Sequence, residues 1–267
     1  MNWTRHPIAS LSFVVLVLAT PHIALAETLV PPFPNSFAGT QVWTTAGSPY
    51  IVNGDVYMRF GSLTIEPGVV VKFAAGANLR VHADVHMNIQ GIASAPIYFT
   101  SMQDDSVGGD TNNDGSATTP HPAAWGFLSL GGGSWNSNMQ LSYIKVRYGG
   151  ATGISTIYDS YSAGDAPALI LEFQWFLGSP GRQYALSNIE VSHSPHGLAV
   201  YVGPNNSVEI TNSSFHDNTG EGAHKFQIRN FQGGDGAGGL NIANSWWGNP
   251  SGPHHLTANP TGTGDAV

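Results

Sequence analysis

Short apolar runs recur along the chain between Tyr50 and Thr100, and turn sequences such as "EPG" and "AAGAN" separate them. Several apolar positions in these runs recur at even spacing, namely Leu63, Val71, Leu79 and Met87. No window keeps a helical period for several turns, so the pattern does not indicate amphipathic helices. Many short strands at even spacing predict an all-β repeat, sandwich or barrel.

Longer self-similarity favours a stacked repeat among these all-β folds. The segments "LSNIEV" (186–191) and "ITNSSF" (210–215) align without gaps, and "IANSWW" (242–247) aligns with both at a somewhat longer spacing. The segment "LSYIKV" (141–146) has the same pattern, with Tyr143 in the place of the asparagine. Three strands of about eight residues make one coil of about 24 residues, which is the period of a solenoid whose coils stack.

The aligned asparagines predict one corner of successive coils. Asn188, Asn212 and Asn244 would lie above one another, and their side-chain amides could form a hydrogen-bonded ladder that stabilises a sharp turn. The alternative is that asparagine is simply frequent in turns. In the last segment, alternation predicts that one of Trp246 and Trp247 faces the core and the other faces outward.

Four motifs in order carry a resemblance to a known family. They are "SPYIVNGDVYMRFGSLTIEPGVVVKF", "IYFTSMQDDSVGGDTNNDG…AAWGFLSL", "LSYIKVRYGG" and "NSWWGNPSGPHH…NPTGTGDAV". Over residues 48–267 the chain resembles the right-handed parallel β-helix proteins of the pectate-lyase-like superfamily, in particular its exported bacterial members. The resemblance implies a right-handed solenoid of three parallel sheets. It does not imply lyase activity, because one fold hosts many functions.

Residues 1–26 have the pattern of a secretory signal peptide. Arg5 supplies a basic start, "IASLSFVVLVLAT" is an apolar stretch, and "ALA" at 24–26 gives the small residues that a signal peptidase needs. We expect cleavage after Ala26 and export to the cell surface, the medium or the periplasm. A buried N-terminal helix and a retained membrane anchor are the alternatives. No later segment approaches the ~20 apolar residues of a membrane span, so no membrane insertion is expected after cleavage.

The rest of the chain divides into a lead-in over 27–47 and a β-helix over 48–267. Within the β-helix we expect a loop insertion at 102–124 and an irregular excursion at 150–183. The chain stops at "GTGDAV", directly after a family motif. An uncapped solenoid exposes strand edges, so we expect a further domain or a partner at the C-terminal edge.

Composition narrows the functional classes. Cleavage of the signal peptide removes Arg5, which leaves 8 basic and 17 acidic residues and a net charge of −9. This negative charge argues against nucleic acid and anionic membranes as partners. The chain has no cysteine, so its core or a metal must hold it together without disulfides. Gly totals 33 and Pro 17 while only 10% of residues are charged, as suits a β-rich protein with many turns.

The stretch "GDTNNDGSAT" (109–118) is a candidate calcium loop. Asp110, Asn112 and Asp114 alternate, and Gly115 stands at the sixth position, where a calcium loop needs a sharp bend. The twelfth position is His121, so the usual closing glutamate is missing.

Two upstream acids could replace that glutamate. Asp104 or Asp105 could close the site from the other side of the loop. The sequence therefore predicts one structural Ca²⁺ bound by Asp104 or Asp105 together with the alternating ligands. The alternative is a solvated acidic turn.

Candidates for catalysis are few. Lys145 and Arg147 alternate on one strand and could form a cationic patch of a polysaccharide lyase, or simply the solvated face of a strand. In the register of the repeat His193 stacks beside Asp217, which could make a general base with its orienting acid, or a polar turn.

An aromatic stretch interrupts the repeat. Its side chains could stack on sugar rings or pack over a sheet as a lid. The candidate ligand-binding residues are Tyr158, Tyr161, Trp175 and Phe176.

Two functional classes remain from the sequence. The first is an exported non-catalytic module that contacts a polysaccharide or cell-surface glycan, or acts as an adhesin. The second is a polysaccharide-active enzyme, either a pectate-lyase-like lyase or a glycoside hydrolase. The absence of a convincing catalytic set favours the first class.

Overall fold

The structure is a computed structural model. It describes residues 1, 27–32, 38–132, 139–151, 154–155, 160–161, 166–173, 181–203, 205–218, 239–254 and 259–264. The predicted signal peptide, apart from Met1, lies outside the described residues. Among the described residues, no helix is long and apolar enough to cross a membrane.

Nearly all regular structure in the described part is β-strand, with one 3-10 turn, η1 (Thr45–Gly47). The strands are β1 (Thr28–Val30), β2 (Ala38–Trp43), β3 (Tyr50–Val52), β4 (Asp55–Met58), β5 (Phe60–Ile65), β6 (Val70–Phe73), β7 (Asn78–Val81), β8 (Val85–Gln90), β9 (Ile97–Ser101), β10 (Leu128–Gly132), β11 (Met139–Arg147), β12 (Ile154–Ser155), β13 (Ser160–Tyr161), β14 (Pro167–Phe173), β15 (Gln183–Ser192), β16 (His196–Val202), β17 (Ser207–Thr211), β18 (Ser214–His216) and β19 (Gly239–Ala243).

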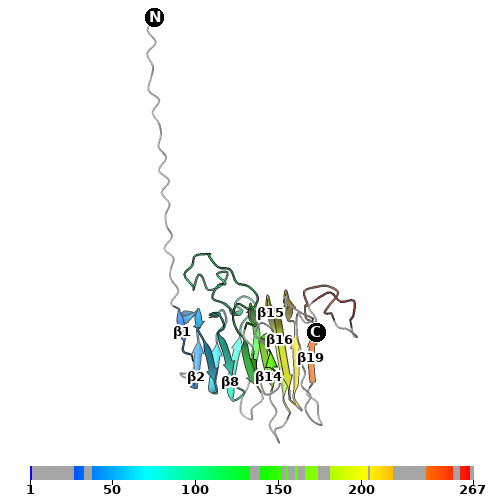
Figure 1. Cartoon of the computed structure of the whole chain (residues 1–267). Coiled ribbons are helices and arrows are strands. Elements are labelled where there is room, and N and C mark those ends of the chain that lie inside the picture. Colours follow the sequence, from blue (N-terminus) through cyan, green and yellow to red (C-terminus); the bar gives the residue numbers. More distant parts are fainter. Residues whose placement is uncertain are drawn as a thin grey trace.

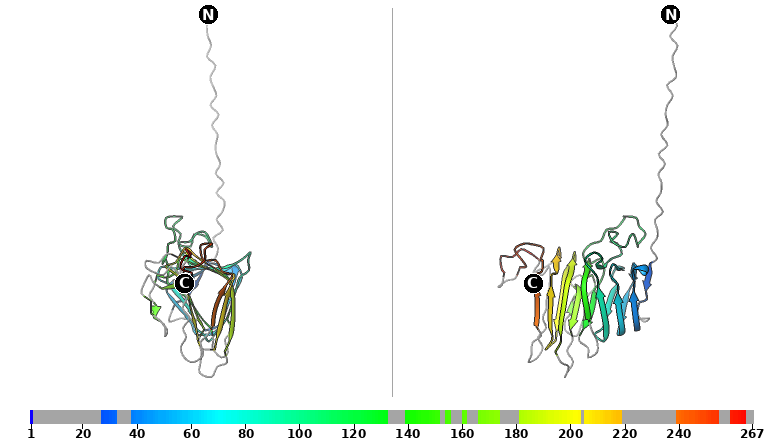
Figure 2. Two further views of the ribbon diagram at one scale, coloured as in Figure 1. Left: turned by 90° about the vertical axis from the view of Figure 1, so that its right-hand side faces the viewer. Right: turned by 180° about the vertical axis from the view of Figure 1, so that it is seen from behind.

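The strands stack in parallel, as Figure 1 shows. One sheet has the order β16-β14-β10-β7-β4, and a larger sheet has twelve strands. Among the described strands only β12 and β13 pair antiparallel. Viewed along the stack, the strands surround a central interior (Figure 2). The predicted all-β class and a parallel, solenoid-like arrangement are therefore confirmed.

The twelve-stranded sheet is branched because its longest strands bend. The first half of β11 pairs with β8 and its second half pairs with β9. At the bend Tyr143 has a left-handed φ of 49°, and the equivalent Asn188, Asn212 and Asn244 have φ of 56°, 51° and 52°. A left-handed residue turns the chain sharply, and asparagine adopts this conformation more readily than most other residues. Each coil therefore turns a corner at the position of the sequence repeat.

The spacing of paired strands follows the predicted coil length where no insertion intervenes. Gly61 pairs with Val85 and Gln183 with Ser207, each one predicted coil length further along the chain. The offset is about twice as large between β8 and β11, because a long loop precedes β10. It is also nearly doubled between β11 and β15, where the excursion intervenes.

The core is built from side chains that alternate inward along each strand. In β8 buried and exposed residues alternate strictly over "VHMNIQ". The inward residues of successive coils lie in register, so that Ile97, Ile144 and Ile189 form one buried row. Burying such side chains on every coil contributes about 1.5–3 kcal/mol each relative to exposure, which holds the chain together without disulfides.

The segment predicted as an irregular excursion, 150–183, contains a regular strand. Residues 167–173 form β14, which pairs with both β10 and β16 and is buried throughout. The strand lacks polar alternation because its outer side is also covered. A second small apolar cluster lies there, made of Phe127, Ala166, Ile170, Ala199 and Tyr201.

Candidate functional site

The loop between β9 and β10, residues 102–127, contains the predicted calcium ligands, and it projects from the stack (Figure 1). Asp104 holds its first turn. One oxygen of its carboxylate accepts a hydrogen bond from Thr100 Oγ1 at 2.7 Å, and the other accepts one from the backbone N–H of Ser106 at 3.2 Å. Asp104 is only 2% exposed. Its oxygens are thus engaged in fixing the loop to the end of β9.

A buried lysine lies beneath the loop. Lys72 on β6 is 0% exposed, and its ammonium donates a hydrogen bond to the carbonyl of Gly109. A Cβ on Gly108 would lie 3.2 Å from Lys72 Cε, so the loop packs directly on this side chain. Burial lowers the pKa of Lys72, and the charges of Asp104, Asp105 and Asp110 partly oppose that shift. No pattern in the sequence places Lys72 beside these acids, because only the fold brings the loop over β6.

Trp125 anchors the returning end of the loop. Its side chain is fully buried and stacks on Phe73, with ring centroids 4.0 Å apart. The indole N–H donates to the carbonyl of Arg147 at 2.6 Å. Both ends of the loop are therefore fixed to the stack, and the acidic segment is held between them.

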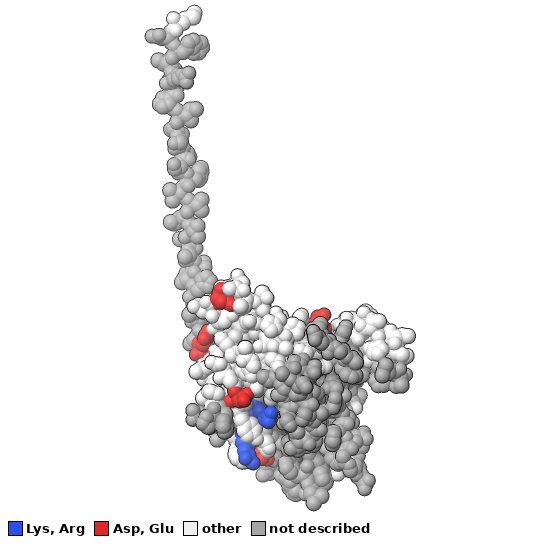
Figure 3. Space-filling view, viewed as in Figure 1, with Lys and Arg blue, Asp and Glu red and all other residues white. Residues whose placement is uncertain are grey.

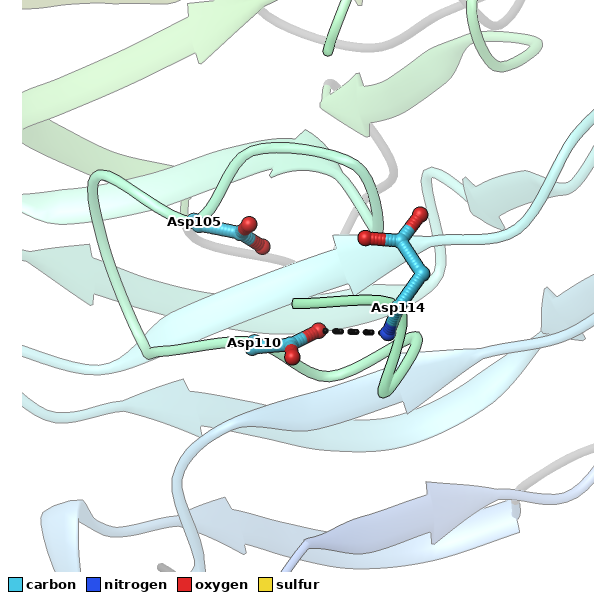
Figure 4. Close-up of side chains that lie close together, drawn as sticks. All are labelled: Asp105, Asp110 and Asp114. Carbon is cyan, nitrogen blue, oxygen red and sulfur yellow. Dashed lines mark hydrogen bonds between the residues drawn. The ribbon is translucent and has the colours of Figure 1, made fainter. Parts of the chain in front are cut away.

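Three carboxylates meet within this loop. Asp105, Asp110 and Asp114 each offer an oxygen, and these atoms all lie within 4.8 Å of one another. Figure 4 shows the side chains of Asp105 and Asp114 facing a common space from opposite sides of the loop. Two oxygens that bind one Ca²⁺ at 2.3–2.6 Å can be at most about 5 Å apart. The three oxygens are therefore close enough to share one calcium ion.

The backbone of the loop orients two of these carboxylates. Asp110 accepts hydrogen bonds from the N–H groups of Asp114 at 3.2 Å and Gly115 at 2.8 Å. Gly115 has a φ of 75°, which glycine adopts without strain. Asp114 in turn accepts from the N–H of Ala117 at 3.2 Å. The alternating acids therefore close a tight turn even before any ion is considered.

Two oxygens in the cluster have no donor. Asp105 Oδ1 and Asn112 Oδ1 are buried, and no described hydrogen bond reaches either atom. The amide nitrogen of Asn112 donates to Asp114 Oδ2 at 2.9 Å, so Asn112 presents its nitrogen to that carboxylate. Burial and the charge of Asp110 raise the pKa of Asp105, although Lys72 opposes the shift. A cation would stabilise the ionised form of Asp105.

Lys145 and Arg147 lie on the outer side of β11, and both bind the same acid. Lys145 Nζ is 2.7 Å from Glu190 Oε2, and Arg147 Nη2 is 2.9 Å from Glu190 Oε1. Burial raises the pKa of Glu190, but hydrogen bonds and charge from the two cations outweigh it and leave the pKa lowered. Both cations also lie near the ring of Tyr98, at 6.0 and 5.3 Å from its centre. In this arrangement neither cation is poised as a free base.

His193 and Asp217 lie on neighbouring coils, as the register requires. His193 Nε2 is 4.0 Å from Asp217 Oδ2, while His216 Nδ1 is closer, at 2.7 Å from the same oxygen. The hydrogen bond from His216 lowers the pKa of Asp217. The carboxylate is thus bound mainly by its sequence neighbour His216, which is not among the residues predicted from the repeat register.

The corner asparagines are stacked, but their amides do not bond to one another. The register places Asn188 beside Asn212, and Asn212 beside Asn244. None of the hydrogen bonds among the described residues joins two of these amides, and Asn188 Nδ2 donates instead to Ser187 Oγ at 3.0 Å.

Serines make the links between coils at this corner. Ser213 Oγ accepts from the N–H of Ile189 at 3.1 Å, and Ser245 Oγ accepts from the N–H of Ser213 at 3.3 Å. The asparagines therefore contribute their left-handed backbone conformation to the corner and do not form an amide ladder.

The candidate sugar-stacking aromatics cannot be located from the described side chains. Tyr158, Trp175 and Phe176 lie outside the described residues, and Tyr161 is described only as backbone of β13.

No protein-family model matches this chain, and neither a curated protein nor a solved structure matches it.

Proposed function

We propose that the chain is an exported, non-catalytic parallel β-helix that contacts a glycan, with one structural Ca²⁺ in the loop of residues 102–127. In this proposal the helix is right-handed and has three parallel faces, as its resemblance to pectate-lyase-like proteins implies. The stacked parallel strands and the bends at Tyr143, Asn188, Asn212 and Asn244 support this arrangement.

The observation that carries the calcium part is the cluster of Asp105, Asp110 and Asp114 oxygens within 4.8 Å. The loop region brings four carboxylates together with a single buried ammonium, that of Lys72. A divalent cation would offset the remaining negative charge and would give the orphan oxygen of Asp105 a partner. Asp104 fixes the loop instead of binding the ion, because its carboxylate is buried against Thr100 and Ser106 and is not one of the three whose oxygens lie within 4.8 Å of one another.

The pairing of Lys145 and Arg147 with Glu190 supports a non-catalytic role. A lyase needs a basic group free to take a proton near the metal. Here both cations are bound to one carboxylate on the outer surface. The described surface seen in Figure 3 is mostly uncharged, with few and scattered charged groups, which suits a neutral partner better than an acidic one.

Calorimetric titration with CaCl₂ tests the calcium site. A site without a bidentate glutamate is expected to bind with a Kd of about 0.1–1 mM, in the range of extracellular modules. At ~2 mM calcium and a Kd of ~0.3 mM the expected stabilisation is about 1.2 kcal/mol. Addition of EDTA should therefore lower the Tm by about 2–5 °C and leave the strands folded.

The matched variants are Asp110→Asn with Asp114→Asn, which keep an acceptor for the backbone N–H groups, and Asp84→Asn, a carboxylate outside the loop. We expect the first pair to abolish both the heat of binding and the EDTA effect, and the control to change neither. If the wild-type protein shows no calcium binding at millimolar concentration, the cluster is a solvated acidic turn and this part of the proposal is wrong.

A further inference from the structure

A groove of about 250 Å³ crosses three stacked coils on the outer side of the corner. Its lining comes from the bends and the strands that follow them, and from the short connection before β9. The lining includes Tyr143, Lys145, Asn188, Glu190, Asn212 and Ser214. Its volume is below the roughly 300–1,000 Å³ of pockets that enclose a drug-sized ligand. It therefore suits one or two units of a longer chain.

Two asparagines, Asn188 and Asn212, line this groove from neighbouring coils. Asn188 and Asn212 are adjacent in the register and do not bond to each other. Asn188 uses its nitrogen on Ser187, and no described hydrogen bond engages the side chain of Asn212. An amide offers donors and an acceptor together, which is what a sugar hydroxyl requires.

The charged groups at the groove contact one another, and one positive charge remains in excess. Lys145 and Glu190 both line the groove and lie 2.7 Å apart, nitrogen to oxygen. Arg147 adds a second cation to the same carboxylate. A charged ligand would have to compete with these contacts, whereas a neutral ligand would not. Binding of a neutral ligand thus leaves these contacts intact.

An exposed tryptophan continues the same row beyond the groove. Ser214 lines the groove and bridges to Trp246 on the next coil. Trp246 is 46% exposed, whereas Trp247 is 9% exposed and packs on Phe215 at 5.1 Å. An exposed indole next to a partly apolar groove offers a flat surface on which an apolar ring face can stack. Glu190, Ser214 and Trp246 follow one another in the register. Strands lie about 4.8 Å apart, so Trp246 is two coil spacings, about 10 Å, from Glu190.

From these features we propose that the groove and Trp246 bind a neutral polysaccharide that runs along the stack. Asn188 and Asn212 donate and accept hydrogen bonds with sugar hydroxyls, and Trp246 stacks on a ring. This inference rests on the proposed glycan-contacting function, but it does not depend on the calcium site. A neutral extended peptide could also use amides and an apolar floor. The exposed indole favours a sugar ring, because a ring presents a flat apolar face.

Calorimetric titration or ligand-observed NMR with defined oligosaccharides tests the site. The probes are cellohexaose, mannohexaose and N-acetylchitohexaose, with a hexagalacturonate and a capped neutral hexapeptide as comparators. We expect the wild-type protein to bind at least one neutral hexasaccharide. Trp246→Ala should weaken that binding about tenfold, equivalent to about 1.4 kcal/mol. Phe60→Ala is the matched control, because Phe60 is 54% exposed and lies outside the groove lining.

The amide role has its own matched set. Asn188→Asp with Asn212→Asp keeps a side chain that tolerates left-handed φ but replaces both amide donors by negative charge, so binding should fall about tenfold or more. Asn205→Asp makes the same change at a left-handed asparagine that lies outside the lining and outside the row that leads to Trp246, and binding should not change. Unchanged Tm values in these variants exclude unfolding as the cause.

The outcomes separate this inference from the proposed function. If a neutral hexasaccharide binds wild type and all variants equally, the glycan-contacting function stands and the groove assignment is overturned. Binding of hexagalacturonate alone keeps the glycan function but overturns the neutral-ligand assignment. Binding of the hexapeptide alone, or of none of the probes, overturns both.

Discussion

Replacement of Glu190 by glutamine is the most direct test of how the outer surface of β11 and β15 is held together. The change keeps the shape of the side chain and removes its charge. In the native structure Glu190 accepts from Lys145 at 2.7 Å and from Arg147 at 2.9 and 3.1 Å. The variant leaves two cations side by side near Tyr98 without a counter-charge. We therefore expect a loss of stability.

The size of the loss follows from the exposure of the three side chains. Glu190, Arg147 and Lys145 are 17%, 22% and 30% exposed, so the pairs lie between surface and buried. Exposed pairs contribute about 0.2–1 kcal/mol each, and hydrogen bonds to charged groups up to about 1.5–3 kcal/mol. Because glutamine still accepts one hydrogen bond, we expect a loss of about 1–2 kcal/mol. This corresponds to a fall of about 2–8 °C in Tm for a chain of this size.

The dependence on pH distinguishes an ionic cause from a packing cause. The two cations hold the pKa of Glu190 below its usual value near 4.5, despite its burial. Its contribution is therefore fully present above the unfolded pKa and is lost as the pH falls through the folded pKa. The difference between wild type and variant should be constant above about pH 5.5 and should shrink below about pH 4.5.

Urea unfolding curves from about pH 3 to 8 measure this difference, and Glu209→Gln serves as control. Glu209 lies exposed on the neighbouring strand β17, and its described hydrogen bond is a 3.5 Å contact from Asn241. We expect the control to change stability by less than about 0.5 kcal/mol. Equal stability of Glu190→Gln and wild type at pH 7, or a deficit of the same size at pH 3, would refute the ionic explanation.

Two further predictions concern the loop and the corner. Lys72→Met should remove a rise in stability at alkaline pH. Because burial lowers the pKa of Lys72, the native state releases the Lys72 proton at a pH where the unfolded chain still holds it. The stability of the wild type should therefore rise relative to that of the variant as the pH increases toward 10.5. Urea unfolding between about pH 8 and 10.5 measures this gain, and parallel profiles would contradict it. Asn212→Ala should cost about 1 kcal/mol because alanine is strained at a φ of 51°, whereas Asn212→Gly should cost much less. Equal losses in the two variants would show that the left-handed backbone is not the cause.

Local residue patterns were enough to predict the strand class and the repeating corner. The alternation in "VHMNIQ" is observed as strict burial and exposure, since successive side chains of a strand point to opposite sides. The repeat containing Asn188 and Asn212 predicted the register, and both residues turn the chain with positive φ. The strand alternation depends on neighbours in sequence, and the corner register depends on a coil without insertions. Residue spacing was therefore sufficient to predict both.

The boundaries of the insertions were less predictable. The loop was expected to end at residue 124, but β10 begins at Leu128, because Trp125 and Phe127 pack as part of the loop's return. The excursion was expected to run to residue 183, but it is interrupted by β14. A strand buried on both sides shows no polar alternation, so "PALILEF" gave no clear strand signal.

The sequence by itself therefore determined the all-β class, the coil length and the identity of the acids in the loop. Only the tertiary structure decided what those residues do. It engaged Asp104 in fixing the loop, gathered Asp105, Asp110 and Asp114, and buried Lys72 beneath them. It also gave Lys145 and Arg147 a shared partner on β15, which is distant along the chain. The physical reason is that insertions of different length separate these residues along the chain, while coil stacking sets their distance in space.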